Sequence, residues 1–282
     1  MGWHSVSNPE VATRRSAIAP ILVTFVAVTT FWIVSAQDWR ILQTAWADDV
    51  LKFIVWVGLC VGVVRLLDRA PLSTAWRDLG LGKSVGHGYG FGLMATLPMA
   101  LLVIFVTRTG AGPDAVIGGV LLGPFAEELL FRGFLFAQLV RSARWRVWPA
   151  ILVSAAAFGL AHVPDLSTQL AGDLLRVLSG LGTETLIQRF ASVLPYVTVQ
   201  AAGGVLFAWV FHRWGSLWQA VGLHSCINLW WILMEGSEAV GYSGAGVGAP
   251  HVAQALAVAL AIGLTLRLRP RVVQNPESSP IP

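Results

Sequence analysis

The chain has 282 residues, of which 55% are hydrophobic and only 12% are charged, and its mean hydropathy is +0.68. Soluble domains carry roughly a quarter charged residues, so this composition excludes an ordinary soluble domain and predicts an integral membrane protein. The net charge of +4 is too modest to indicate nucleic-acid binding, and the two cysteines lie in apolar segments, where they suggest no disulfide framework.

Apolar segments follow one another along most of the chain. Lipid admits only helices and closed barrels, and these segments lack the period-two alternation of barrel strands. Since a spanning helix needs about 20 apolar residues, we predict eight spans, over residues 17–36, 50–67, 85–106, 116–139, 148–162, 193–211, 217–234 and 252–266. The expected fold is an all-α polytopic bundle over residues 17–270, flanked by a segment 1–16 and a disordered tail 271–282 rich in Pro and Ser.

Lys and Arg residues are concentrated in the connections on one side of these spans. With the N-terminus inside, most of them fall in the cytoplasmic connections, as the positive-inside rule requires. We therefore expect both termini to be cytoplasmic. Arg far outnumbers Lys, which is typical of a GC-rich genome, and we expect a bacterial plasma membrane.

Three segments allow more than one interpretation. Arg14 and Arg15 precede the first span and Val34-Ser35-Ala36 resembles a signal-peptide cleavage site, but the apolar run is long for such a signal and favours a retained helix. Residues 163–191 hold several charges and are either a re-entrant or interfacial stretch or an ordinary external loop. Glycine pairs at positions 58 and 62, 86 and 90, and 119 and 123 have the spacing of close helix contacts.

The fourth span contains three ionisable residues, Glu127, Glu128 and Arg132. Each costs roughly 2.5 to 3.5 kcal/mol within a membrane and needs a partner or a function. Glu128 and Arg132 are four residues apart, which suits an ion pair along one helix. Glu127 has only apolar residues at the corresponding positions. It must therefore meet another helix, either as a general base or in a plain hydrogen bond.

Two further spans hold candidate partners for Glu127 at similar depth. His162 ends the fifth span, one turn after Phe158, while His224 and Asn228 share one face of the seventh. A single buried His is often a packing residue or part of a proton relay. Glu127 with both His residues and Asn228 is a set that can deprotonate a water and stabilise an oxyanion.

Other catalytic templates fit this sequence poorly. There is no HExxH zinc motif. Ser225 and Cys226 are too close to His224 in sequence to face it on a helix. Gly82-Lys83-Ser84 imitates the end of a P-loop, but Arg77 replaces its first glycine.

Three motifs in this region resemble those of the CAAX prenyl protease and bacteriocin-processing (CPBP, or Abi) family of intramembrane proteases. They are similar to EExxxR, FxxxH and HxxxN, and they read Glu127-Glu128-Leu129-Leu130-Phe131-Arg132, Phe158-Gly159-Leu160-Ala161-His162 and His224-Ser225-Cys226-Ile227-Asn228. The resemblance covers residues 115–235 and implies a helical membrane endopeptidase acting on a peptide or protein substrate, which could be lipidated, in the bilayer.

The same resemblance implies roles for the motif residues. Glu127 and His162 would activate the attacking water, and His224 and Asn228 would stabilise the oxyanion. Glu128, Arg132 and Phe158 would support the site. Members are often labelled metalloproteases; a divalent metal such as Zn would bind Glu127, His162 and His224, but the preferred mechanism requires no cofactor. The alternatives are a catalytically silent scaffold or bacteriocin self-immunity protein and, disfavoured by the lack of an internal repeat, a proton-coupled transporter.

Overall fold

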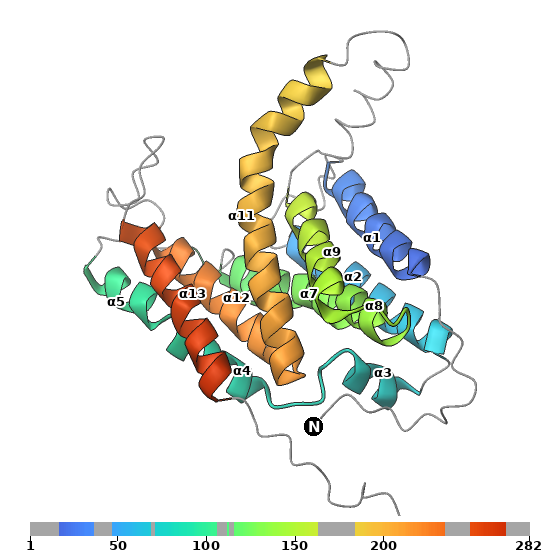
Figure 1. The fold of residues 1–282 in the computed structure, drawn as a ribbon, viewed down its shortest axis with the longest axis horizontal. Helices are drawn as coiled ribbons and strands as arrows, with labels where there is room; N and C mark the ends of the chain where they lie inside the picture. Colours follow the sequence, from blue (N-terminus) through green and yellow to red (C-terminus); the bar gives the residue numbers. More distant parts are fainter. Residues whose placement is uncertain are drawn as a thin grey trace, which may run out of the picture.

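A computed structural model describes residues 17–36, 47–68, 71–105, 112, 116–162, 184–234 and 249–268. Across these residues the structure is helical and contains no strand, so the all-α prediction is confirmed (Figure 1). The helices before the central segment are α1 (Ile18–Ala36), α2 (Ala47–Asp68), α3 (Leu72–Asp78), α4 (Val85–Ala95) and α5 (Leu97–Phe105). The helices after it are α9 (Val147–Ala161), α11 (Glu184–Trp214), α12 (Leu217–Met234) and α13 (Ala249–Arg267).

Two helices in the described part of the chain are long and apolar enough to cross a membrane. They are the Val193–Trp214 portion of α11 and α13, and α4 with α5 adds a third if the bent pair forms one span. Helix α12 has the bounds predicted for the seventh span, and α9 differs from the fifth by one residue at each end. The total of eight spans stays a prediction.

The predicted third span is not one straight helix. Its two halves, α4 and α5, meet at Thr96 with a bend of 60°. Pro98 is the second residue of α5, and a proline there prevents α4 from continuing, because its ring lacks an N–H and collides with the preceding turn. The Thr96 hydroxyl donates to the Gly92 carbonyl oxygen at 2.8 Å and accepts from Trp230 Nε1 at 2.7 Å, which ties the bend to α12.

Helix α11 begins earlier than predicted, at Glu184, and has 31 residues. Residues 184–191 were expected in a re-entrant stretch or a loop, and they form the first turns of this helix instead. Their sequence contains no Gly or Pro and propagates a helix well. Residues 163–183, the segment 1–16 and the tail 271–282 lie outside the described residues.

Two helix pairs pack with their backbones in contact. A Cβ added to Gly222 of α12 would lie 2.2 Å from the Gly88 carbonyl oxygen of α4, and one added to Gly92 would lie 2.2 Å from the Gly222 carbonyl oxygen. Gly159 of α9 and Gly204 of α11 approach the opposite helix in the same way, with Cβ distances of 2.6 and 2.9 Å to backbone atoms. These glycines let α12 pack closely against α4, and α9 against α11.

The predicted glycine pairs were mostly wrong. A Cβ at Gly58, Gly62 or Gly90 would meet nothing within 4 Å, and one at Gly86 would meet only Ser84 Oγ, at 3.8 Å. Gly119 is the exception, with Ile232 Cδ1 at 2.9 Å. Four-residue spacing places two glycines on one helix face, but it does not say which face meets a neighbour.

The predicted fourth span is a helical segment that changes its winding. It consists of η2 (Ile117–Leu122) and η3 (Leu129–Phe136), which are π-helical, and of α7 (Gly123–Glu128) and α8 (Ala137–Arg141), which are α-helical. Every residue of η3 is buried, as are Glu127 and Glu128. Helices α2, α9, α11 and α12 all contact this segment, which lies centrally in Figure 1. π-Helical turns occur frequently at functional sites.

Candidate active site

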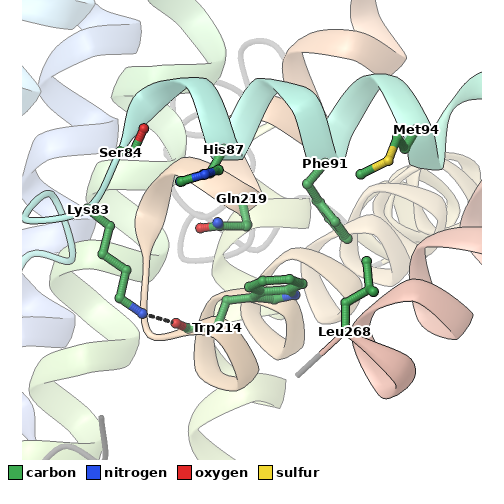
Figure 2. A pocket seen from close by; sticks show the side chains of 8 residues that line it. All are labelled: Lys83, Ser84, His87, Phe91, Met94, Trp214, Gln219 and Leu268. Atoms are coloured by element: carbon green, nitrogen blue, oxygen red, sulfur yellow. Dashed lines mark hydrogen bonds between the residues drawn. The ribbon is translucent and has the colours of Figure 1, made fainter. Parts of the chain in front are cut away.

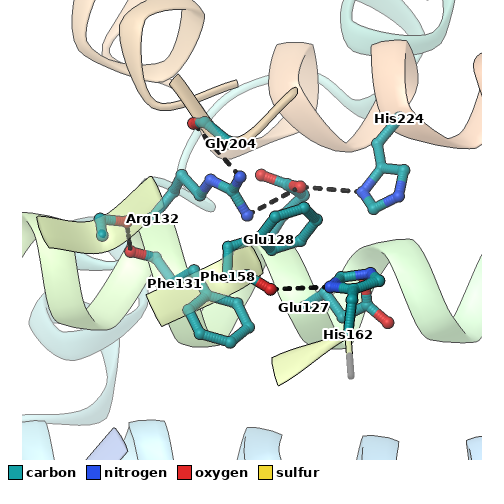
Figure 3. A network of polar contacts seen from close by, with 9 residues as sticks. Glu127, Glu128, Phe131, Arg132, Phe158, His162, Gly204 and His224 are labelled. Carbon is teal, nitrogen blue, oxygen red and sulfur yellow. Dashed lines mark hydrogen bonds and ion pairs between the residues drawn. The ribbon is translucent and has the colours of Figure 1, made fainter. Parts of the chain in front are cut away.

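The candidate residues come from three parts of the bundle. Glu127 and Glu128 end α7, and Arg132 follows in η3. His162 directly follows the last residue of α9 as its C-cap, and His224 lies in α12. Figure 3 shows the Glu128 carboxylate between the Arg132 guanidinium and the His224 ring, and Glu127 beside the His162 ring.

Glu127 meets His162 across the contact between α7 and α9. The distance from Glu127 Oε2 to His162 Nε2 is 3.5 Å. His162 Nδ1 lies 2.8 Å from the Phe158 carbonyl oxygen, and because a carbonyl only accepts, Nδ1 must carry a hydrogen. A neutral His162 then presents a bare Nε2 to Glu127. Two facing lone pairs repel, so this contact is favourable when one proton resides on either Nε2 or the carboxyl group.

Glu128 joins a second, more deeply buried network. Its Oε1 lies 3.1 Å from Arg132 Nη1 and 2.9 Å from His224 Nδ1. The side chains of Glu128 and Arg132 are fully buried, and Arg132 Nη2 also donates to the Gly204 carbonyl oxygen at 3.3 Å. The ion pair predicted from sequence is present. The bond to His224 was not predicted, because the sequence suggested a helix-local role for Glu128.

Aromatic rings enclose both networks. The Phe158 ring centroid lies 4.3 Å from that of His162 and 5.9 Å from that of His224. Arg132 Cζ is 4.1 Å from the Phe158 centroid, within cation–π range. Phe158 therefore touches three charged or polar members of the site. A fixed ring at this position restricts the rotamers of both imidazoles.

Phe207 of α11 is a member of this site that sequence reasoning missed. Its ring stacks on His224 with centroids 4.8 Å apart and planes 16° apart, and Arg132 Cζ lies 5.3 Å from its centroid. No motif includes Phe207. Its surroundings are uniformly apolar in the sequence, so no signal distinguishes it from neighbouring packing residues.

Asn228 lies one turn after His224 on α12 and contacts η2, whereas His224 contacts α7. Asn228 Nδ2 donates to the Gly119 carbonyl oxygen at 2.9 Å. This bond fastens the π-helical turn η2, which leads into α7, to α12. It uses one of the two amide hydrogens of Asn228.

Glu127, His162 and His224 are the residues that a metal ion would use if one bound here. Within the described ranges, no three or more His, Cys, Asp or Glu side chains are placed so that they could hold one. His224 Nδ1 is bonded to Glu128, and His162 Nδ1 faces the Phe158 carbonyl oxygen. Each ring is therefore oriented by a protein partner at Nδ1.

The family comparison agrees with the motifs. A family model described as Type II CAAX prenyl endopeptidase Rce1-like matches residues 113–230. The matched stretch runs from just before η2 into α12 and includes every candidate residue. No curated protein matches the chain, and neither does any solved structure. Residues 113–230 are thus similar to Rce1-like type II CAAX prenyl endopeptidases, consistent with the CPBP family of intramembrane proteases that the three motifs resemble.

Proposed function

We propose that this protein is an intramembrane endopeptidase of the CAAX type, in which Glu127 and His162 activate the water that hydrolyses a peptide bond. The observation that carries the proposal is the contact between Glu127 Oε2 and His162 Nε2 at 3.5 Å. The Rce1-like match over residues 113–230 supports a peptidase.

In the proposed first step, the proton shared by the pair resides on His162 Nε2, and Glu127 is a carboxylate. A water bound beside them gives one proton to Glu127 while its oxygen forms a bond to the carbonyl carbon of the substrate. The π electrons of the carbonyl move onto its oxygen. When the C–N bond breaks, Glu127 returns the proton to the departing amine, and the pair is restored.

The oxyanion would be stabilised from α12. His224 donates from Nε2 when its ring carries both protons, since Nδ1–H is directed to Glu128 Oε1 at 2.9 Å. Glu128 and Arg132 together are electrically neutral, so a protonated His224 adds one positive charge opposite the developing negative charge. In this proposal the second amide hydrogen of Asn228 donates to the same oxygen, while the first donates to Gly119. Glu128 and Arg132 thus act by positioning His224.

The proposed setting is the bilayer interior of a bacterial plasma membrane, with eight spans and both termini in the cytoplasm. The apolar helices and the one-sided distribution of Lys and Arg support this topology. A substrate peptide near its own lipidated C-terminus would reach the site through the membrane. No metal takes part in the proposed steps.

Cleavage assays on the purified protein in liposomes test the proposal, using a library of prenylated and unprenylated peptides. Glu127→Gln and His162→Ala should each lower turnover about a hundredfold, a typical contribution of a general base. Asp78→Asn is the matched control, because Asp78 is paired with Arg141 at 3.0 Å outside the site. It should leave turnover unchanged.

Two results would contradict the proposal. If Glu127→Gln cleaves as well as wild type, Glu127 is not the base. If wild type binds a peptide or protein partner in the membrane but cleaves nothing, the chain is a scaffold or self-immunity protein. Turnover measured with and without a chelator, together with metal analysis of the same sample, decides whether a metal is required.

A further inference from the structure

A second site is indicated away from Glu127, where four helices end together. Helices α4 and α12 begin there, and α11 and α13 end there. The ends line a half-open cavity of about 360 Å³, within the size range of small-molecule pockets. Ends of spanning helices lie at the level of lipid headgroups. The location therefore suits a ligand that is part polar and part apolar.

The cavity changes from polar to apolar along one face of α4. Ser84, His87, Phe91 and Met94 all line it and are spaced three or four residues apart, so they lie on one side of the helix (Figure 2). Ser84 and His87 are at the exposed start of the helix, whereas Phe91 is buried. Leu268, beyond the end of α13, extends the apolar part.

Among the described residues that line the cavity, the polar end carries positive charge without a matching carboxylate. Lys83 lines it, and no Asp or Glu is among the lining residues. The Lys83 ammonium donates to the Trp214 carbonyl oxygen, which leaves two of its three hydrogens for other partners. Burial lowers the pKa of Lys83 below its ordinary value. The N-terminus of α4, whose Ser84 makes no side-chain cap bond, adds the positive end of a helix dipole.

Gln219 provides an independent indication of a ligand. Its side chain lines the cavity, is only 4% exposed, and has a buried Oε1 without a hydrogen-bond partner. Figure 2 shows the amide directed into the space between Lys83, His87 and Trp214. An unsatisfied buried amide oxygen costs about 1 to 3 kcal/mol. A ligand that brings a hydrogen-bond donor beside an anion would satisfy Gln219 and Lys83 together.

We propose that this cavity binds a membrane phospholipid whose headgroup carries a hydrogen-bond donor, such as phosphatidylethanolamine or phosphatidylglycerol. Its phosphate binds Lys83 and the N-terminus of α4, and its ammonium or hydroxyl group donates to Gln219 Oε1. One acyl chain lies along Phe91, Met94 and Leu268. Phosphatidylcholine has the same phosphate but no headgroup donor, so it fills the cavity less well. The proposal does not depend on the peptidase activity.

Native mass spectrometry of the purified protein tests this assignment. The detergent-solubilised chain is titrated separately with phosphatidylethanolamine, phosphatidylglycerol and phosphatidylcholine of identical acyl chains. Glycerol 3-phosphate distinguishes a lipid from a free phosphate compound. The two donor-bearing lipids should bind about tenfold more tightly than phosphatidylcholine, as expected for one hydrogen bond to a buried group. Glycerol 3-phosphate should bind far more weakly than either.

Matched variants assign the two headgroup contacts. Lys83→Gln should lower the affinity for all three lipids about tenfold, the effect of losing a charge-assisted hydrogen bond. Lys83→Arg should retain binding. Gln219→Met, which keeps the volume of the side chain, should remove the preference over phosphatidylcholine. Arg77→Gln removes an exposed charge from α3, outside the cavity, and should change nothing. Thermal unfolding verifies that each variant is folded.

Three outcomes would overturn the proposal. The first is equal affinity of wild type for phosphatidylethanolamine and phosphatidylcholine. The second is an equal loss with Arg77→Gln and Lys83→Gln, which would indicate general attraction to the positively charged surface. The third is binding of glycerol 3-phosphate as tight as that of the lipids, which would assign the cavity to a soluble phosphate compound.

Discussion

The substitution Gly222→Ala tests the backbone contact between α4 and α12. The added methyl group would lie 2.2 Å from the Gly88 carbonyl oxygen, where ordinary contact begins at 3.4 Å. Because the obstructing atom is backbone, the helices must separate by roughly 1 Å to restore contact distance. Overpacking of this kind costs about 1–3 kcal/mol, and we expect the upper half of that range since no side chain can rotate away.

The same substitution should also reduce activity. His224 lies two residues after Gly222 on α12 and contacts Glu128 Oε1 at 2.9 Å, a distance that a displaced helix cannot keep. A cost of about 2–3 kcal/mol should lower the apparent melting temperature by roughly 4–12 °C for a chain of this size.

Thermal unfolding in detergent and peptide cleavage measure these two effects. Gly90→Ala is the matched control, because its Cβ would meet nothing within 4 Å, and alanine is the better helix former. It should be neutral or slightly stabilising. If Gly222→Ala unfolds at the wild-type temperature, or if Gly90→Ala is equally destabilised, the two helices do not cross at these glycines.

Three further substitutions test the site itself. Glu128→Gln leaves Arg132 without its counter-charge and should destabilise the fold by about 3–5 kcal/mol. The double variant Glu128→Gln with Arg132→Met should recover much of that stability in thermal unfolding. It should not recover the cleavage rate. Phe207→Leu removes the ring stacked 4.8 Å from His224. The substitution should lower kcat about three- to tenfold, which corresponds to the free energy of one aromatic contact. An unchanged kcat would show that the ring does not position His224. Asn228→Asp replaces a donor to a carbonyl oxygen 2.9 Å away with an acceptor and should destabilise the fold by about 1–3 kcal/mol, which a wild-type melting temperature would contradict.

Much of the helical framework could be predicted because a lipid environment permits few backbone structures. Each apolar run must be a helix, and its length fixes approximate bounds, so α9 and α12 were predicted within one residue. The break at Thr96 was also marked in the sequence, by Pro98, but hydropathy alone does not reveal it. The early start of α11 was missed since charged residues near a helix end resemble a loop.

The candidate site was only partly predictable. Glu127 lacks a helix-local partner, so the need for a partner on another helix followed from sequence. The bond between Glu128 and His224 could not be predicted from the sequence, because the spacing of Glu128 and Arg132 already provided Glu128 with an ion-pair partner. Phe207 carries no polar atom, and only its stacking on His224 distinguishes it.

The sequence by itself determined which residues are expensive to bury: an unneutralised acid, a helical ion pair, two imidazoles and an amide, all within apolar helices. That inference depends on local residue spacing and on the free-energy cost of a charge in lipid. Neither depends on how the helices pack together. Only the tertiary structure decided the pairing, since His162 faces Glu127 and His224 faces Glu128. The reason is physical: the pairing depends on which helix faces meet, and the period of a single helix carries no information about its neighbours.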